Sequence, residues 1–117
     1  MHQDFTSCIE ACNACADACD RCAAACLKER DVAMMAECIR LDIDCAGICR
    51  LAAGYMARRS EFAHEMCRLC AAICEACARE CARHPQEHCQ ACAKACERCA
   101  SECNRMAGIG QGQGSRA

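Results

Sequence analysis

The sequence predicts an all-α protein: an antiparallel, up-down-up-down four-helix bundle with a cysteine-lined core. Cysteines recur at alternating steps of three and four residues, which is the spacing of one face of an α-helix. Short polar breaks separate these runs, and short connections make successive helices antiparallel. The length of 117 residues suits one such domain. Three runs are dense: Cys8, Cys12, Cys15, Cys19, Cys22 and Cys26; Cys67, Cys70, Cys74, Cys77 and Cys81; and Cys89, Cys92, Cys96, Cys99 and Cys103.

The first helix is expected over about residues 4–28, where alanines flank the six core-facing cysteines. Alanine favours helix and lets neighbouring helices approach closely. A short polar connection follows at residues 28–31, and Asp31 can cap the next helix.

The second helix, expected over about residues 32–57, carries only Cys38, Cys45 and Cys49. Its other apolar residues cover more than one face. This pattern indicates a helix buried more deeply than its neighbours or an apolar flank for self-association, and the two are compatible. A homo-oligomer is therefore favoured. The apolar residues are Ile39, Leu41, Ile43, Ile48, Leu51 and Tyr55.

Ser60 is a good N-cap for a third helix over about residues 61–83. A break at residues 84–86 precedes a fourth helix over about residues 85–106, with Pro85 in its first turn. Glycines dominate the sequence that follows. The expected organisation is a bundle over residues 1–107 and a flexible, glycine-rich C-terminal tail over residues 108–117.

The composition argues against several classes of protein. The net charge is −2 and no basic stripe is present, so nucleic-acid binding is not expected. No apolar run approaches the ~20 residues that span a bilayer. The N-terminal residues lack the pattern of a secretory signal, the cysteine count of 19 is odd, and the spacing is helical. These features favour a cytoplasmic protein with reduced thiols over a secreted disulfide scaffold.

The cysteines are predicted to hold soft metal ions. Residues at i and i+4 have Cβ atoms ~5–6 Å apart, so two sulfurs can hold one ion between them. Only the thiolate binds well, and an uncompensated buried charge is costly. One Cu(I) per thiolate leaves the core neutral, whereas zinc with four thiolates leaves two excess negative charges. The sequence therefore predicts many Cu(I) ions, approaching ~19, with all the cysteines as ligands. Protonated cysteines are small hydrophobes, so the metal-free bundle can also fold.

The two ends of the predicted bundle differ. One end collects thioether and imidazole groups that suit capture and transfer of copper. These predicted ligands are Met34, Met35, His84 and His88. The opposite end continues the core-facing stripe with bulky apolar residues. They are Phe5, Met56, Phe62, Met66 and Met106.

Asp42 lies four residues after Cys38 and seven before Cys49, close to the core-facing register. The favoured expectation is that Leu41 faces inward and Asp42 lies at the flank. A role for Asp42 as a secondary ligand or hydrogen-bonding group is the alternative.

The chain resembles the cytosolic branch of the bacterial copper storage proteins over about residues 5–107. The resemblance implies a four-helix bundle, a homotetramer, and a core filled with many Cu(I) ions through cysteine thiolates. It also implies that copper enters at the end bearing Met or His, which here carries Met34, Met35, His84 and His88. It rests on Cys8-Ile9-Glu10-Ala11-Cys12, on Cys38-Ile39-Arg40-Leu41-Asp42 followed by Cys45 and Cys49, on the run Cys67 to Cys81, and on Cys89-Gln90-Ala91-Cys92-Ala93-Lys94-Ala95-Cys96.

The predicted function is non-catalytic binding of Cu(I) for copper storage and detoxification. The expected partners are copper ions and the copper chaperones or small-molecule carriers that exchange them. An iron–sulfur or thiol redox/electron-transfer protein is the alternative. Iron–sulfur ligands cluster on loops near prolines, and C-x-x-C redox pairs accompany a βαβ pattern. Neither context is present, and no nucleophile–base pair indicates an enzyme.

Overall fold

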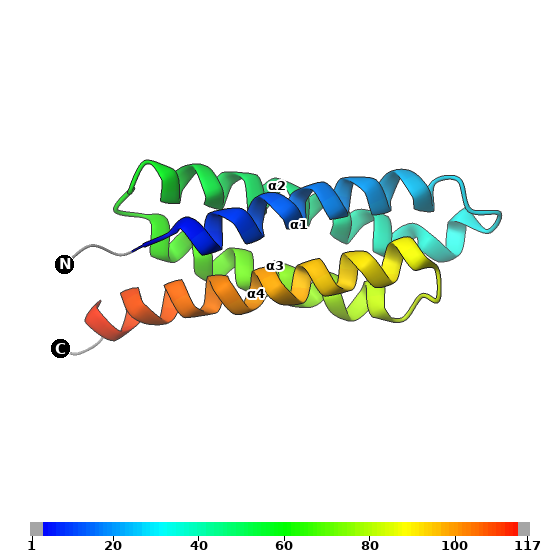
Figure 1. Ribbon diagram of the computed structural model, residues 1–117. Coiled ribbons are helices and arrows are strands. Elements are labelled where there is room, and N and C mark those ends of the chain that lie inside the picture. Colours follow the sequence, from blue (N-terminus) through cyan, green and yellow to red (C-terminus); the bar gives the residue numbers. More distant parts are fainter. Residues whose placement is uncertain (1–3, 115–117) are drawn as a thin grey trace.

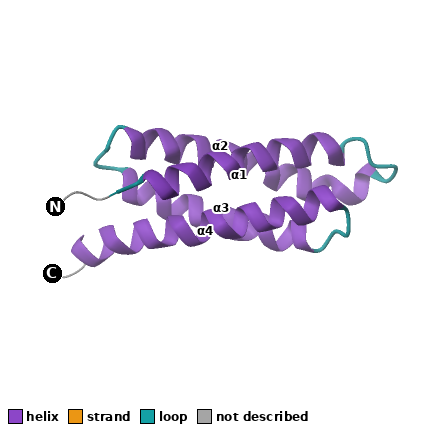
Figure 2. Cartoon of the chain, in the orientation of Figure 1, coloured by secondary structure: helices purple, strands orange, loops and turns teal. Residues whose placement is uncertain are grey.

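A computed structural model describes residues 4–114 of the chain. The elements are α1 (Thr6–Cys26), a short 3₁₀ helix η1 (Val32–Met35), α2 (Ala36–Ala57), α3 (Ala63–Ala82) and α4 (Glu87–Gly114). The described residues form helices joined by loops, and they include no strand (Figure 2). The predicted all-α class is confirmed.

The four long helices form an antiparallel, up-down-up-down bundle (Figure 1). Helix α1 packs against α2 and α4, and α3 packs against the same two helices. The connections at residues 27–31 and 83–86 share one end, and the start of α1 and the last turns of α4 lie at the other end. The result is a rod of 52 × 24 × 17 Å with a single internal axis. Among the described residues, no helix is both long and apolar enough to cross a membrane.

The core consists mainly of small residues. Every cysteine is fully buried, and Ala16, Ala52 and Ala63 are buried equally well beside them. Since alanine and cysteine are short, the helices approach closely around a line of sulfur atoms rather than around leucines. The largest apolar core residues, Met35, Met56 and Met106, lie toward the ends of the rod.

The starts of the helices show which of the predicted capping residues act as caps. The Asp31 carboxylate accepts a hydrogen bond from the Met34 backbone N–H at 3.4 Å, so it caps η1. The Ser60 hydroxyl accepts from the Phe62 N–H at 3.0 Å, in the turn before α3. The prediction that Pro85 lies in the first turn of the fourth helix is wrong. The Gln86 carbonyl accepts the first bonds of α4, which begins at Glu87, so Pro85 precedes the cap.

Helix α4 continues to Gly114, beyond the predicted end near Met106. Glycine is a poor helix former, but no proline interrupts the backbone hydrogen bonds here. The flexibility predicted for residues 108–117 stays a prediction. Residues 115–117 lie outside the described residues.

The apolar residues of α2 lie partly in the core and partly on the outside of the bundle, and self-association through them stays a prediction. Ile48 is buried, and Ile39 and Leu41 pack partly buried against the core. Ile43 and Leu51, by contrast, are 59% and 54% exposed. Helix α2 thus has one face in the core and an apolar outer face.

Candidate metal centre

The cysteine side chains lie along the axis of the bundle in one line, which we call the thiol column. All 19 are free thiols and all are fully buried. Sulfurs on different helices approach closely, as in Cys38–Cys81 and Cys45–Cys74, both at 3.5 Å. Sulfurs one turn apart on the same helix do so as well, at 3.8 Å for Cys70–Cys74. The column is therefore continuous both along and across the helices.

The sulfurs fall into groups of four in which all four atoms lie within 4.8 Å of one another. Four of the groups named below are linked by shared cysteines, so one thiolate can bridge ions in two groups. The shared cysteines are Cys15, Cys19, Cys49, Cys96 and Cys99, and the group at the His88 end contains none of them. The groups include Cys12, Cys49, Cys70 and Cys99; Cys15, Cys49, Cys74 and Cys99; Cys15, Cys19, Cys45 and Cys96; Cys19, Cys77, Cys92 and Cys96; and Cys22, Cys26, Cys38 and Cys89.

These separations fit a metal ion held by two or three thiolates. With a metal–sulfur bond of roughly 2.3 Å, the zinc–thiolate value, three sulfurs around one ion are ~4.0 Å apart and two opposed sulfurs ~4.6 Å apart. Cys22–Cys38 and Cys92–Cys96 are both at 4.0 Å, and Cys15–Cys45 is at 3.7 Å. Comparison of these distances shows that the sulfur atoms need to move by about 1 Å or less to hold a soft ion.

Asp42 lies inside the thiol column, which corrects the expectation that it is at the flank. Its side chain is fully buried. Its Oδ1 accepts hydrogen bonds from the thiols of Cys77 and Cys92 at 3.3 Å, and its Oδ2 accepts from Cys38 at 3.9 Å. Leu41 is only partly buried. The hydrogen-bonding alternative is the correct one, because the register that places Cys38 and Cys45 inward places Asp42 inward as well.

Burial favours the neutral form of the groups in the column. Burial, and after it the charge of the neighbouring Cys92, raise the pKa of Asp42 to about 8. Near the His88 end, burial raises the pKa of Cys26 to about 11, with a further contribution from the charge of Cys38. A bound Cu(I) that replaces a thiol proton keeps such a site neutral.

His88 is the imidazole that contacts the column. Its Nδ1 is 3.5 Å from the sulfur of Cys89, 3.6 Å from Cys22 and 3.9 Å from Cys26. Its Nε2 is 3.0 Å from the Glu29 carboxylate, and a carboxylate only accepts hydrogen bonds. Nε2 therefore carries the proton and donates, which leaves the Nδ1 lone pair facing three sulfurs. The same hydrogen bond lowers the pKa of Glu29.

The other predicted ligands at this end lie beside the column. Met35 is buried, but Met34 is 68% exposed, because η1 has three residues per turn and departs from the α-helical register. His84 follows the end of α3, and its Nε2 contacts the Glu80 carboxylate at 2.9 Å. All three residues line an open cavity of about 470 Å³. His88 is thus the predicted ligand at this end whose ring nitrogen faces the thiols, whereas Met35 joins the buried core and Met34 and His84 lie at the cavity.

The opposite end is apolar. Phe5, Met56 and Met106 are buried, and Met66 packs partly buried against them in the core. Phe62 is 53% exposed, contrary to expectation, since it precedes the first residue of α3 and lies outside the helical register. The His64 ring donates from Nδ1 to the Met106 carbonyl at 2.8 Å.

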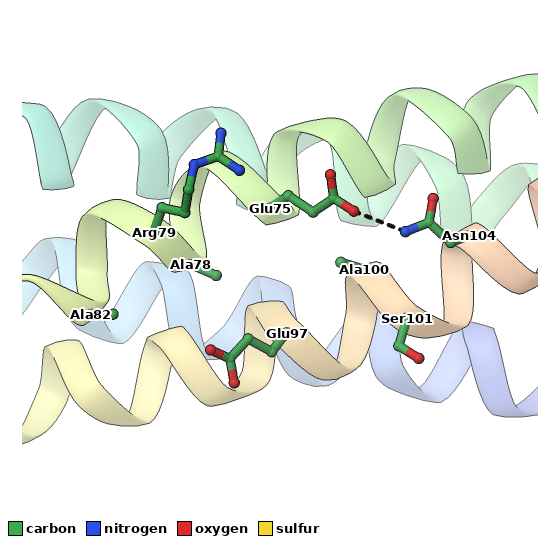
Figure 3. Close-up of a pocket in the computed structure, with 8 residues that line it drawn as sticks. All are labelled: Glu75, Ala78, Arg79, Ala82, Glu97, Ala100, Ser101 and Asn104. Atoms are coloured by element: carbon green, nitrogen blue, oxygen red, sulfur yellow. Dashed lines mark hydrogen bonds between the residues drawn. The ribbon is translucent and has the colours of Figure 1, made fainter.

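A groove of about 460 Å³ runs between α3 and α4 on the outside of the bundle (Figure 3). Small residues such as Ala78, Ala82 and Ala100 line it, and the Glu75 carboxylate accepts a hydrogen bond from the Asn104 amide at 2.9 Å. No cysteine lines this groove. This groove therefore offers no sulfur ligand.

Two residues of this site were missed or misplaced by sequence reasoning. Glu29, which orients His88, lies in a polar connection that gives no periodic signal. Asp42 did have a signal, since its spacing from Cys38 and Cys49 fits the core-facing register. A charged side chain is expected at the surface, but this one follows the core-facing register.

The fold and the column define a class of protein: a helical bundle that binds many soft metal ions through buried thiols. A sequence model of the copper storage protein (Csp) family matches residues 1–108, and the chain belongs to this family. The Cu(I)-bound copper storage protein BsCsp3 is 51% identical, with a TM-score of 0.86 over 90% of this chain and 99% of that one. A cytosolic copper storage protein from Streptomyces lividans with five coppers is 41% identical, with a TM-score of 0.85 over 88% of this chain and 91% of that one. An uncharacterized cysteine-rich protein of Bacillus subtilis, YhjQ, is 51% identical over 75% of this chain and 82% of its own. Both of these solved relatives hold copper, and the resemblance to the copper storage proteins inferred from the sequence is confirmed.

Proposed function

We propose that the chain stores Cu(I) without catalysing a reaction, using all 19 cysteines as ligands and filling the thiol column from the His88 end. The observation that supports this proposal is the overlap of four of the four-sulfur groups, continued toward the two ends by close sulfur pairs such as Cys8–Cys103 and Cys38–Cys81. Because neighbouring groups share cysteines, each thiolate can bridge two ions. The capacity then approaches one ion per cysteine while the core stays neutral.

Copper entry takes place where His88 meets Cys22, Cys26 and Cys89. The oriented Nδ1 offers a neutral ligand at the edge of a group of thiols, so an incoming ion gains a nitrogen and sulfur ligands together. Met34, Met35 and His84 line the adjacent cavity. Thioether and imidazole bind Cu(I) more weakly than thiolate, which suits transient contact on the way in or out.

The proposed setting is the cytoplasm, where thiols stay reduced, as in the cytosolic relative from Streptomyces. Copper chaperones or small-molecule copper carriers deliver and remove the metal. The assembly is a homotetramer, in accord with the exposed apolar residues of α2. Storage serves copper supply and detoxification.

The entry route predicts two variants with slow uptake. His88→Ala removes the nitrogen ligand, and Glu29→Ala removes the acceptor that orients it. We expect the rate of Cu(I) uptake at low copper to fall by about tenfold in each, the order found when an outer partner of a metal-binding histidine is lost. Stopped-flow mixing of reduced protein with a Cu(I)–chelator complex measures this rate.

His64→Ala is the matched control, since that ring lies at the opposite end of the bundle and donates to the Met106 carbonyl. Its uptake rate is expected to stay within about twofold of the wild-type rate, and the capacities of all three variants to stay near that of the wild type. Equal rates for His88→Ala and the wild type would contradict entry at His88.

A further inference from the structure

A small cavity lies on the side of the bundle, between α1 and α4. Its volume is about 140 Å³, which holds roughly five water molecules at the ~30 Å³ that each occupies in the liquid. It shares no lining residue with the larger cavity at the end of the rod. We call it the side cavity, and its lining consists of Ala18, Arg21 and Cys22 of α1 and His88, Ala91 and Cys92 of α4.

The side cavity reaches the thiol column directly, because both of its cysteines belong to the column. The sulfur of Cys22 lies 3.8 Å from that of Cys89. The sulfur of Cys92 lies 3.6 Å from that of Cys19. The Nδ1 of His88 lies 3.6 Å from the sulfur of Cys22. One opening on the side of the bundle is therefore lined by an imidazole and two thiols.

Two alanines leave room for this opening. Ala18 is partly buried and Ala91 is exposed, and each contributes only a methyl group to the lining. A longer side chain at either position would occupy the space beside the thiols. Access through the side cavity therefore depends on small residues at these two places.

Arg21 is the one residue in the lining of the side cavity that carries a full charge. It is exposed, and it forms no ion pair among the described residues. The aspartates within one turn of it, Asp17 and Asp20, pair instead with Arg50 at 3.1 Å. An unpaired guanidinium beside a small, mostly apolar cavity favours an anionic ligand.

We propose that the side cavity binds an anionic complex of Cu(I) with two thiolates of a small-molecule thiol and transfers its ion to the thiol column. The proposal rests on copper storage with entry at His88, as proposed above, and names the class of carrier and its route. Cu(I) with two thiolates carries a single net negative charge, which complements Arg21. The volume admits the copper-bearing end of such a complex but not a protein carrier.

The transfer is an exchange of ligands in which the copper stays Cu(I). The Nδ1 lone pair of His88 and the sulfur of Cys22 form bonds to the ion, and the two bonds from the ion to the carrier's sulfurs break. The proton of the Cys22 thiol passes to one departing thiolate, which leaves as a thiol, and the other thiolate leaves as an anion. One thiolate and one neutral imidazole then hold the ion, so the site is neutral before the ion moves on along the column.

Arg21→Glu tests the charge of the side cavity. Stopped-flow mixing at low ionic strength follows uptake by the reduced, full-length protein from Cu(I) in excess mercaptoethanesulfonate, which has an anionic tail, or in excess cysteamine, which has a cationic tail. We expect uptake from the first carrier to slow by about tenfold, the lower end of the range for electrostatic steering, and uptake from the second to stay the same or to become faster. Arg21→Lys keeps the charge and should stay near the wild-type rate. Equal changes with both carriers, or no change with either, would overturn the proposal.

Ala91→Leu tests the route. A leucine on a helix leans toward the preceding turn, so its side chain covers the space beside His88. We expect uptake from either carrier to slow by about fivefold or more, because a filled cavity leaves no passage to the thiols. Ala72→Leu is the matched control, since Ala72 is an exposed alanine of α3 that does not line the side cavity, and it should keep the wild-type rate.

The combined results separate this route from storage itself. Far-UV circular dichroism and the Cu(I) capacity of each variant should match those of the wild type. Wild-type rates in Ala91→Leu together with slow uptake in His88→Ala would overturn the side route and leave entry at His88 in place. A low copper capacity in the wild type would instead count against storage.

Discussion

The Cu(I)-saturated protein is expected to unfold at a temperature tens of degrees above that of the metal-free protein. An ion present at 100 times its dissociation constant stabilises the folded state by about 2.7 kcal/mol. Each ion in the thiol column joins sulfurs of different helices, such as Cys45 of α2 and Cys74 of α3. Several such ions add up, and each kcal/mol raises the unfolding temperature by several degrees in a domain of this size. Far-UV circular dichroism during heating under anaerobic conditions measures the shift.

Zinc is the control for this expectation. Four thiolates around Zn²⁺ leave two excess negative charges, which a closed column cannot solvate. Saturation with Zn²⁺ should therefore raise the unfolding temperature far less than saturation with Cu(I). Equal shifts for the two metals would show that neutrality of the column does not govern metal choice.

The stability of the metal-free protein is expected to fall by about 3 kcal/mol between pH 5 and pH 7 because of Asp42. The pKa of this carboxyl is about 8 in the folded chain and has its ordinary value of 3.8 in the unfolded chain. Between these values the folded state keeps a proton that the unfolded state has lost, so rising pH favours unfolding. By the same linkage, this loss of stability is absent below about pH 4 and complete above about pH 8. Urea unfolding of the reduced, metal-free protein at several pH values measures it.

Asp42→Asn is the matched variant, because it keeps the shape and an acceptor for the Cys77 and Cys92 thiols but does not titrate. Its stability should vary much less between pH 5 and pH 7. The same slope in Asp42→Asn and the wild type would assign the pH dependence to other groups.

The helical repeat of the cysteines was sufficient to predict the bundle and its inward-facing thiols. Steps of three and four residues place side chains on one face whatever the tertiary context, so Cys8 to Cys26 could be placed in the core before the structure was known. The same rule fails for residues that lie outside an α-helix. Met34 lies in a 3₁₀ turn and Phe62 precedes α3, and both are exposed.

Contacts between segments distant in sequence could not be predicted from periodicity. Glu29 reaches His88 across the end of the bundle, and no local pattern links these two residues. Asp42 was predicted incorrectly because the desolvation cost of a carboxylate argued against burial. The structure shows how that cost is reduced: the surrounding thiols donate hydrogen bonds, and the raised pKa favours the neutral acid.

Anaerobic titration of the reduced protein with Cu(I) against a competing chelator, followed by metal analysis, tests the central claim most directly. A neutral thiol column with bridging sulfurs predicts a capacity approaching one ion for each of the 19 cysteines, with the helix content retained throughout. Uptake of fewer than about four ions per chain, the number that a few isolated thiol pairs would hold, would contradict it.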